Sequence, residues 1–123
     1  MWEVATTDAF DEWFKELGED AQTEVIAKVK LLELLGPQLR RPHADTLNGS
    51  KHANMKELRA DTKGMIMRIA FAFDPDRAAI LLLGGDKSGK SQRRFYHQLI
   101  AKADSLYELH LVKRRERKRT KGG

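Results

Sequence analysis

The stretch MIMRIAFAF, residues 65–73, decides the fold of this chain. Its large apolar side chains alternate with smaller or charged ones, which is the two-residue period of a β-strand with one face against a core. Met67, Ile69 and Phe71 are therefore expected to face that core. Arg68 is expected on the opposite face, flanked along its strand by residues that leave room for a ligand against the sheet.

Two further strands are predicted next to this one. MKELR at 55–59 is a short strand, and it joins residues 65–73 through a turn at 61–64. A second turn, DPDR at 74–77, leads into AAILLL at 78–83, a continuous apolar run expected of a central strand. Three consecutive strands joined by tight turns indicate an antiparallel meander.

Helical periodicity lies on both sides of the meander. After a short predicted strand at 2–6, Phe10 begins an apolar stripe at i, i+3, i+4 and i+7, and a second amphipathic helix starts at Asp20 and ends at Gly36-Pro37. Residues 37–54 contain two prolines and no periodicity, so they are predicted as a loop with a binding role. A last helix is expected over residues 92–109.

The order of elements, β-α-α-β-β-β-α, predicts an α+β domain. We expect a small antiparallel-rich sheet with the helical hairpin packed on one face, followed by a C-terminal helix. Residues 1–109 would form this domain. Residues 110–123 would be a basic C-terminal tail, for which disorder is an open alternative.

Composition excludes several classes of protein. A chain of 123 residues has the length of a single domain, and its 41% hydrophobic and 33% charged residues are typical of a globular one. Cysteine is absent and the four histidines show no metal-ligand spacing, so we expect no disulfide, no metal and a reducing, cytoplasmic compartment. No apolar run approaches the length of a membrane span, so we expect no membrane partner.

The charge is distributed unevenly along the chain. The net charge is +5, but residues 110–123 hold seven basic side chains against one acidic, which leaves 16 against 17 for residues 1–109. Residues 1–36 carry nine acidic side chains against three basic ones. The cations of the later segments fit a polyanionic partner, although a charge run can also be a solvated surface.

The segment GGDKSGKS, residues 84–91, satisfies the phosphate-loop pattern G-x-x-x-x-G-K-[ST]. A true phosphate loop needs a strand before it, a helix after it and a further strand that completes a crossover. That further strand has no candidate here, so we expect no nucleotide cofactor. The three glycines, Gly84, Gly85 and Gly89, are instead expected to form a loop that approaches a ligand closely.

Several cations crowd this loop, with Asp86 opposing them. Arg93 and Arg94 fall near the start of a helix, where the helix dipole disfavours positive charge. A sequence that accepts that cost favours an anion at this place. The alternative is a surface loop whose lysines only aid solubility. The cations concerned are Lys87, Lys90, Arg93 and Arg94.

In this order, the elements resemble the RelE/ParE superfamily of toxins from bacterial toxin–antitoxin pairs, and most closely its phage-derived HigB-like branch. The resemblance covers roughly residues 1–109. It is carried by KELR at 56–59, MRIAFAF at 67–73, the loop at 84–90 and FYHQLIAKADSLYELH at 95–110. It implies a small sheet with a concave basic face, and messenger RNA cleavage on the ribosome in the RelE and HigB branches. The ParE branch implies DNA gyrase as the target.

The resemblance also implies roles for single residues. Arg68 matches the family arginine, Lys87 matches a basic residue after the last strand, and Tyr96 and His97 lie near a C-terminal aromatic residue or histidine of RNA-cleaving members. One departure is Glu57, which stands where RelE has a lysine, so the general base stays open. The predicted catalytic residues are Arg68, Lys87, Tyr96 and His97, and the predicted RNA-binding residues are Arg59, Lys90, Arg93, Arg94, Lys113, Arg114 and Arg115.

The chemistry expected of these residues needs no cofactor. RNA can be cleaved by its own 2′-OH if the protein orients that group, moves its proton and stabilises extra phosphate charge. Arg68 would stabilise the transition state, and Tyr96 or His97 would exchange protons or stack on a base. His97 could instead be a partly buried helix residue with a structural hydrogen bond, Tyr96 could be mere packing, and Arg59 could pair with Glu57.

The function predicted is therefore that of a toxin that cleaves messenger RNA on the ribosome and stops growth. Its partners would be the ribosome, messenger RNA and a cognate antitoxin with a helix-turn-helix DNA-binding domain. Two alternatives stay open at this point: a ParE-like toxin that acts on gyrase without cleaving RNA, and an RNA-binding module without catalysis.

Overall fold

The computed structural model describes residues 1–122 and the side chains up to Thr120. Its centre is a five-stranded sheet with strand order β1-β5-β4-β3-β2. The short β1 pairs in parallel with β5, and all other pairs are antiparallel, so the predicted meander of three consecutive strands is confirmed. The strands are β1 (Val4–Thr6), β2 (Ala44–Thr46), β3 (Lys56–Thr62), β4 (Met65–Phe73) and β5 (Ala79–Asp86).

Three α-helices surround the sheet: α1 (Asp8–Lys15), α2 (Glu19–Leu35) and α3 (Gln92–Gly122). Thr7 is the N-cap of α1, because its hydroxyl oxygen accepts the backbone N–H of Phe10 at 3.1 Å. Gly36 closes α2 with a φ of +54°, and a side chain there would collide with the Trp2 ring. The predicted loop at 37–54 also contains the end of the short helix η1 (Gly36–Gln38) and the edge strand β2.

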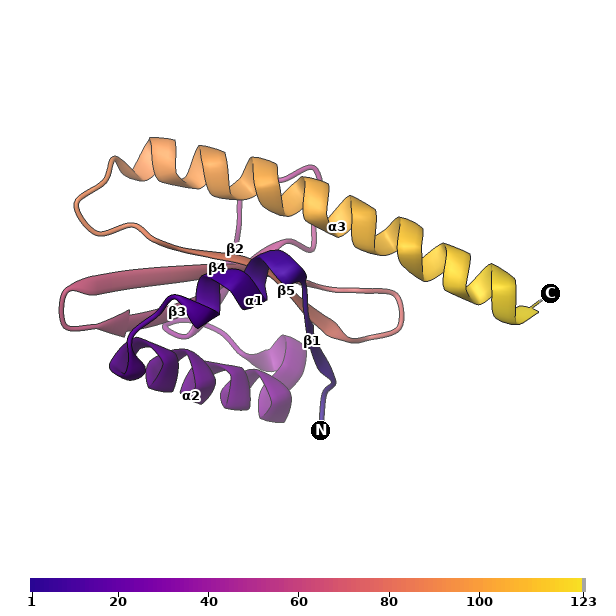
Figure 1. The fold of residues 1–123 in the computed structure, drawn as a ribbon, viewed down its shortest axis with the longest axis horizontal. Helices are drawn as coiled ribbons and strands as arrows, with labels where there is room; N and C mark the ends of the chain where they lie inside the picture. Colours follow the sequence, from indigo (N-terminus) through magenta and orange to yellow (C-terminus); the bar gives the residue numbers. More distant parts are fainter. Residues whose placement is uncertain (123) are drawn as a thin grey trace.

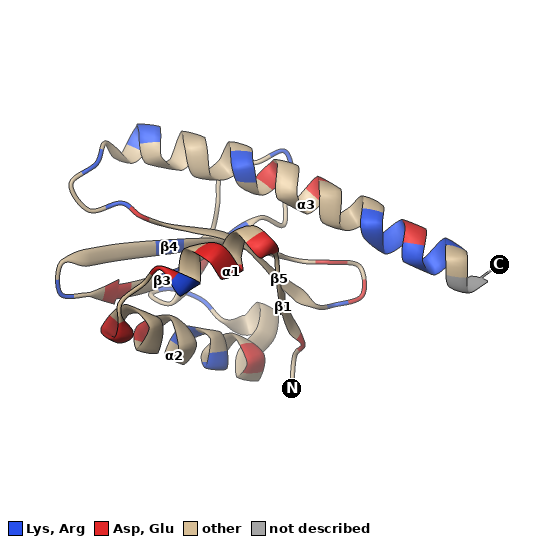
Figure 2. Ribbon diagram, in the orientation of Figure 1, with Lys and Arg blue, Asp and Glu red and all other residues tan. Residues whose placement is uncertain are grey.

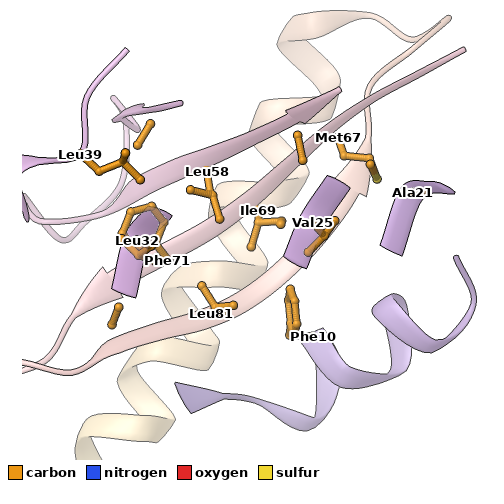
Figure 3. Close-up of a cluster of buried hydrophobic side chains, with 13 residues drawn as sticks. Phe10, Ala21, Val25, Leu32, Leu39, Leu58, Met67, Ile69, Phe71 and Leu81 are labelled. Carbon is orange, nitrogen blue, oxygen red and sulfur yellow. The ribbon is translucent and has the colours of Figure 1, made fainter. Parts of the chain in front are cut away.

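The sheet is covered on both faces. The helices α1 and α2 lie on one side of it, and α3 runs along the other (Figure 1). A first core lies under α1 and α2 and includes Val25, Leu32, Ile69 and Phe71 (Figure 3). A second core lies under α3 and contains Leu47, Met55, Ala70, Ala72, Ile80, Leu82, Phe95, Leu99, Ala103 and Tyr107.

The alternation of β4 matches the prediction from its sequence. Met67 and Ile69 are buried in the first core, and Ala70 and Ala72 in the second. The room that was expected for a ligand beside Arg68 is taken largely by α3, which packs against that face through apolar side chains of its own. Arg68 is only 7% exposed.

Helix α3 does not end at residue 109, as expected, but continues to Gly122 through the segment predicted as a tail. Ion pairs with the turn between β4 and β5 fix this part of the helix. His110 Nε2 lies 2.9 Å from Asp74 Oδ2, Arg114 Nε lies 2.7 Å from Asp76 Oδ2, and Lys118 Nζ lies 2.6 Å from Asp76 Oδ1. Hydrogen bonds from Arg114 and Lys118 lower the pKa of Asp76 well below its ordinary value. None of the described helices is apolar over a long enough stretch to cross a bilayer.

The glycines of GGDKSGKS have a different role from the expected one. Gly84 and Gly85 are not in a ligand loop but lie within β5, directly before its last residue, Asp86, and between the two helical layers. A Cβ on Gly84 would lie 2.4 Å from the Trp13 ring of α1, and a Cβ on Gly85 would lie 3.0 Å from Phe95 of α3. Both glycines therefore let a helix approach the strand closely.

This packing predicts the effect of a single methyl group. Gly84→Ala should lower the free energy of unfolding by about 1–3 kcal/mol, because the Trp13 ring, which is partly buried in the first core, has to move. Gly18→Ala is the matched control, since nothing lies within 4 Å of its added Cβ, and it should cost less than about 1 kcal/mol. Urea unfolding of both variants measures the difference. Equal stabilities would contradict the packing role of Gly84.

Candidate functional site

The candidate site lies on the face of the sheet that α3 covers, at the end nearest the start of that helix. The strand register places Arg59 of β3 opposite Arg68 of β4, and Arg68 opposite Gly85 of β5. Because Gly85 has no side chain, Phe95 at the start of α3 can pack against β5 at the position opposite Arg68. We call the group of six side chains that meet here the arginine–tyrosine cluster; its members are Glu57, Arg59, Asp61, Arg68, Lys87 and Tyr96.

The centre of the cluster is the carboxylate of Glu57, which is buried on β3. Tyr96 donates its phenolic O–H to Oε1 of Glu57 at 2.7 Å, and Arg59 Nε donates to Oε2 at 3.1 Å. Arg68 Nε lies 3.8 Å from Oε1. Glu57 thus connects α3 to the two arginines of the sheet.

Arg68 is held mainly by Asp61, at the far end of β3. Its Nη1 donates to Oδ1 of Asp61 at 2.7 Å and to the carbonyl of Met67 at 2.9 Å. Its Nε is buried and has no hydrogen-bond partner within the described structure. Burial is the largest single influence and lowers the pKa of Arg68, but the hydrogen bond and charge of Asp61, together with the influence of Tyr96, outweigh it, so the pKa of Arg68 is raised. The guanidinium is therefore charged and not fully satisfied.

Lys87 and Tyr96 complete the cluster from the other side. Lys87 Nζ lies 3.4 Å from the hydroxyl oxygen of Tyr96 and 5.2 Å from its ring centroid. Burial and the nearby charge of Arg68 lower the pKa of Lys87. Burial and the hydrogen bond to Glu57 raise the pKa of Tyr96 to about 12. At neutral pH, Tyr96 is thus a proton donor to Glu57, and Lys87 loses its proton more easily than an ordinary lysine.

The structure brings together some of the predicted site residues and not others. Arg68, Lys87 and Tyr96 meet in the cluster, and Arg59 joins them while pairing with Glu57 and with Asp45 at 3.3 Å. His97 does not join. It is exposed, and it makes no hydrogen bond or ion pair with any described residue, because it projects about 100° around the helix from Tyr96.

The predicted RNA-binding cations divide in the same way. Most are exposed and form no ion pair among residues 1–120; these are Lys90, Arg93, Arg94, Lys113 and Arg115. Arg114 differs, because its guanidinium donates two hydrogen bonds to Asp76, at 2.7 and 3.1 Å. The positive charge of Arg114 is therefore compensated by Asp76. Figure 2 shows the basic residues along α3 and the acidic ones of α1 and α2 on the other side of the sheet.

Two members of the cluster were missed by reasoning from the sequence. The sequence predicts Glu57 only as a departure from a family pattern and as a possible partner of Arg59, a pairing that the structure confirms. The sequence places Asp61 in a turn, whereas Asp61 lies in β3. The sequence does contain a signal for both residues, because side chains 57, 59 and 61 of one strand must lie on the same face as each other. What the sequence does not show is the position of Tyr96, which depends on how closely α3 approaches β5.

The cluster contains the groups that a phosphate reaction needs. A buried arginine can bind a phosphate, and a tyrosine–carboxylate pair beside a lysine of lowered pKa can move protons. Among the described residues, no group of three or more His, Cys, Asp or Glu side chains could hold a metal ion.

Relatives of known sequence identify the family. Residues 12–108 match the family described as phage-derived Gp49-like proteins. The chain is 49% identical over 98 residues to a Mycobacterium tuberculosis protein named "Putative toxin HigB3", covering 80% of this chain and 83% of that one. It is 40% identical over 125 residues to "Putative toxin HigB2" of the same organism, covering 97% of this chain but 62% of that longer protein.

Solved structures agree on the fold. The isolated RelE toxin of E. coli superposes with a TM-score of 0.56 at 10% identity, over 79% of this chain and 95% of that one. RelE from the archaeal RelE–RelB complex of Pyrococcus horikoshii superposes with a TM-score of 0.54 at 13% identity, over 72% and 97%. At these identities the likeness concerns the fold. The family match and the sequence relatives establish that this chain belongs to the phage-derived Gp49-like family, and that the two putative HigB toxins are its relatives.

Proposed function

We propose that this protein is the toxin of a toxin–antitoxin pair and cleaves messenger RNA on the ribosome. Membership of the family supports the assignment as a toxin, and the arginine–tyrosine cluster supports the proposal that it cleaves RNA. The observation that carries the proposal is the buried, charged Arg68 with a donor left unsatisfied, next to the Tyr96–Glu57 pair and Lys87. Such a set suits a reaction at phosphorus that needs no metal.

In the proposed reaction, the 2′-OH of the RNA attacks the adjacent phosphorus. Tyr96 takes the proton of the 2′-OH as it passes its own proton to Glu57, to which it is already hydrogen-bonded. A 2′,3′-cyclic phosphate forms, and the bond to the 5′ oxygen breaks. The ammonium of Lys87 gives that oxygen a proton, which its lowered pKa favours. Arg68 contacts the phosphate and stabilises the added charge in the transition state.

The partners follow from this function. The toxin would be neutralised by a cognate antitoxin; one of the structural relatives is itself part of a RelE–RelB complex. We propose that this antitoxin carries a helix-turn-helix domain and that the toxin acts in the cytoplasm, where ribosomes are. The exposed cations of the first turn and of the far half of α3 would hold RNA phosphates outside the cluster.

The first prediction concerns Arg68. Arg68→Gln, which keeps most of the side-chain volume, should reduce RNA cleavage about 100-fold to 1,000-fold, because the transition state loses its cation. Lys30→Gln, on the exposed side of α2, is the matched control and should keep full activity. Mapping RNA 5′ ends after brief induction measures cleavage within translated codons. Intact messages with gyrase-linked DNA damage would contradict cleavage and indicate the gyrase alternative.

The second prediction concerns the proton relay. Tyr96→Phe should lower the cleavage rate about 100-fold or more while leaving RNA affinity nearly unchanged, because it removes the hydroxyl and keeps the ring. His97→Gln, one position further along α3, should have little effect, since His97 does not contact the cluster. Single-turnover rates and binding constants on programmed ribosomes separate the two effects. A larger effect of the His97 variant would overturn the assignment of Tyr96.

The third prediction concerns the far half of α3. Replacing Lys113 and Arg115 with alanine should weaken ribosome binding and lower its dependence on salt, with a slope smaller by roughly 0.7 for each lost phosphate contact. The matched control replaces Lys15 and Lys30 with alanine. This makes the same change in net charge on the other side of the sheet and should leave the salt slope nearly unchanged. If both double variants give the same salt slope, these cations belong to a solvated surface.

A further inference from the structure

The arginine–tyrosine cluster is expected to be basic, but carboxylates compensate its cations, although one of these, Asp45, is shared with the exposed Arg41 at 3.7 Å. The three cations Arg59, Arg68 and Lys87 are matched by three carboxylates, since Asp45 pairs with Arg59 in addition to the bonds within the cluster. The formal charge of these six groups is therefore 3 − 3 = 0. An RNA phosphate that enters this site has to compete with the protein's own carboxylates.

The carboxylates are not equally fixed. The side chain of Glu57 is 5% exposed, and it accepts hydrogen bonds from both Tyr96 and Arg59. The side chain of Asp61 is 57% exposed, and its one ion pair among the described residues is with Arg68, at 2.7 Å. Displacing Asp61 from Arg68 would return it to water and break no other bond that it makes with a described side chain. Glu57 is thus the fixed anion, and Asp61 is the one that can be displaced.

The arginine itself is also suited to an exchange of ligands. Its side chain is 9% exposed, and the exposed carboxylate of Asp61 lies on the solvent side of it. Its Nε has no hydrogen-bond partner among the described side chains, since Glu57 Oε1 is 3.8 Å away. A guanidinium that keeps an unsatisfied donor gains from a ligand with more oxygen atoms than a single carboxylate. A phosphate is such a ligand.

We infer that Asp61 is a positioning residue whose carboxylate occupies the place of an RNA phosphate on Arg68, so that RNA enters the site by displacing it. The inference rests on the proposed function for the nature of the ligand. In the free protein, Asp61 keeps Arg68 oriented and charged beside the start of α3. It also lowers the affinity of the site for RNA in solution, because binding exchanges one anion for another.

Asp61→Asn removes the negative charge and keeps the hydrogen bond, because the amide oxygen can still accept from Arg68. The probe is a fluorescently labelled single-stranded RNA with 2′-O-methyl groups, which cannot be cleaved because its nucleophile is blocked. We expect Asp61→Asn to bind it about fivefold more tightly than the wild type, as removal of a competing ion pair would give. The slope of affinity against salt should also become steeper. Asp61→Glu should bind like the wild type.

The matched control is Glu12→Gln, an equal change of net charge on the exposed side of α1, across the sheet from the cluster. Its effect on RNA affinity should stay below about twofold at physiological salt, because charges this far apart are screened. The gain from Asp61→Asn should also vanish when Arg68 is replaced by Gln. An Asp61→Asn gain no larger than that of Glu12→Gln, or one that persists without Arg68, would overturn the inference.

The same measurements separate this inference from the proposed function. If the wild type binds RNA and Arg68→Gln does not, while Asp61→Asn changes nothing, RNA recognition stands and the role of Asp61 is refuted. If neither the wild type nor Asp61→Asn binds RNA, with normal circular dichroism for both, the inference is refuted, whereas cleavage on the ribosome is decided separately by the mapping of RNA 5′ ends.

Discussion

The structure depends on the burial of β4 on both faces. Once α1 and α2 cover one side and α3 the other, every side chain of the central strand must be apolar, small or compensated. Arg68 is the charged residue in the middle of this strand, and its burial requires the carboxylates of β3 beside it. The acidic residues of the site are therefore a condition of the fold as well as a part of the proposed chemistry.

The same two-sided packing explains why a nucleotide-binding pattern occurs in a chain without that architecture. Gly84 and Gly85 are small because Trp13 and Phe95 approach β5 from opposite sides. The rest of the segment is a turn built on Asp86, whose Oδ1 accepts the N–H groups of Ile66 and Ser88. A spacing of glycines that resembles a phosphate loop thus arises from helix–sheet packing.

Much of the fold could be predicted because its signals are local. The alternation in residues 65–73, the apolar stripe after Phe10 and the turn residues before Ala78 each depend on near neighbours. The cover over the second face could not be predicted, because an apolar stripe on α3 does not reveal which side of the sheet it meets. Arg68 and Tyr96 could be named as site residues from the family resemblance. The role of Glu57 as their common partner could not, because it depends on the strand register and on the position of α3.

The separation of charge across the sheet gives the molecule an electric dipole moment. Acidic side chains gather on α1 and α2, and basic ones on the opposite side and along the far half of α3 (Figure 2). In the field of a polyanion, such a molecule experiences a torque before any contact forms, and it turns α3 toward the negative surface. The face that carries the arginine–tyrosine cluster is the face that α3 covers, so a long-range orientation of the whole protein presents the site in the first encounter.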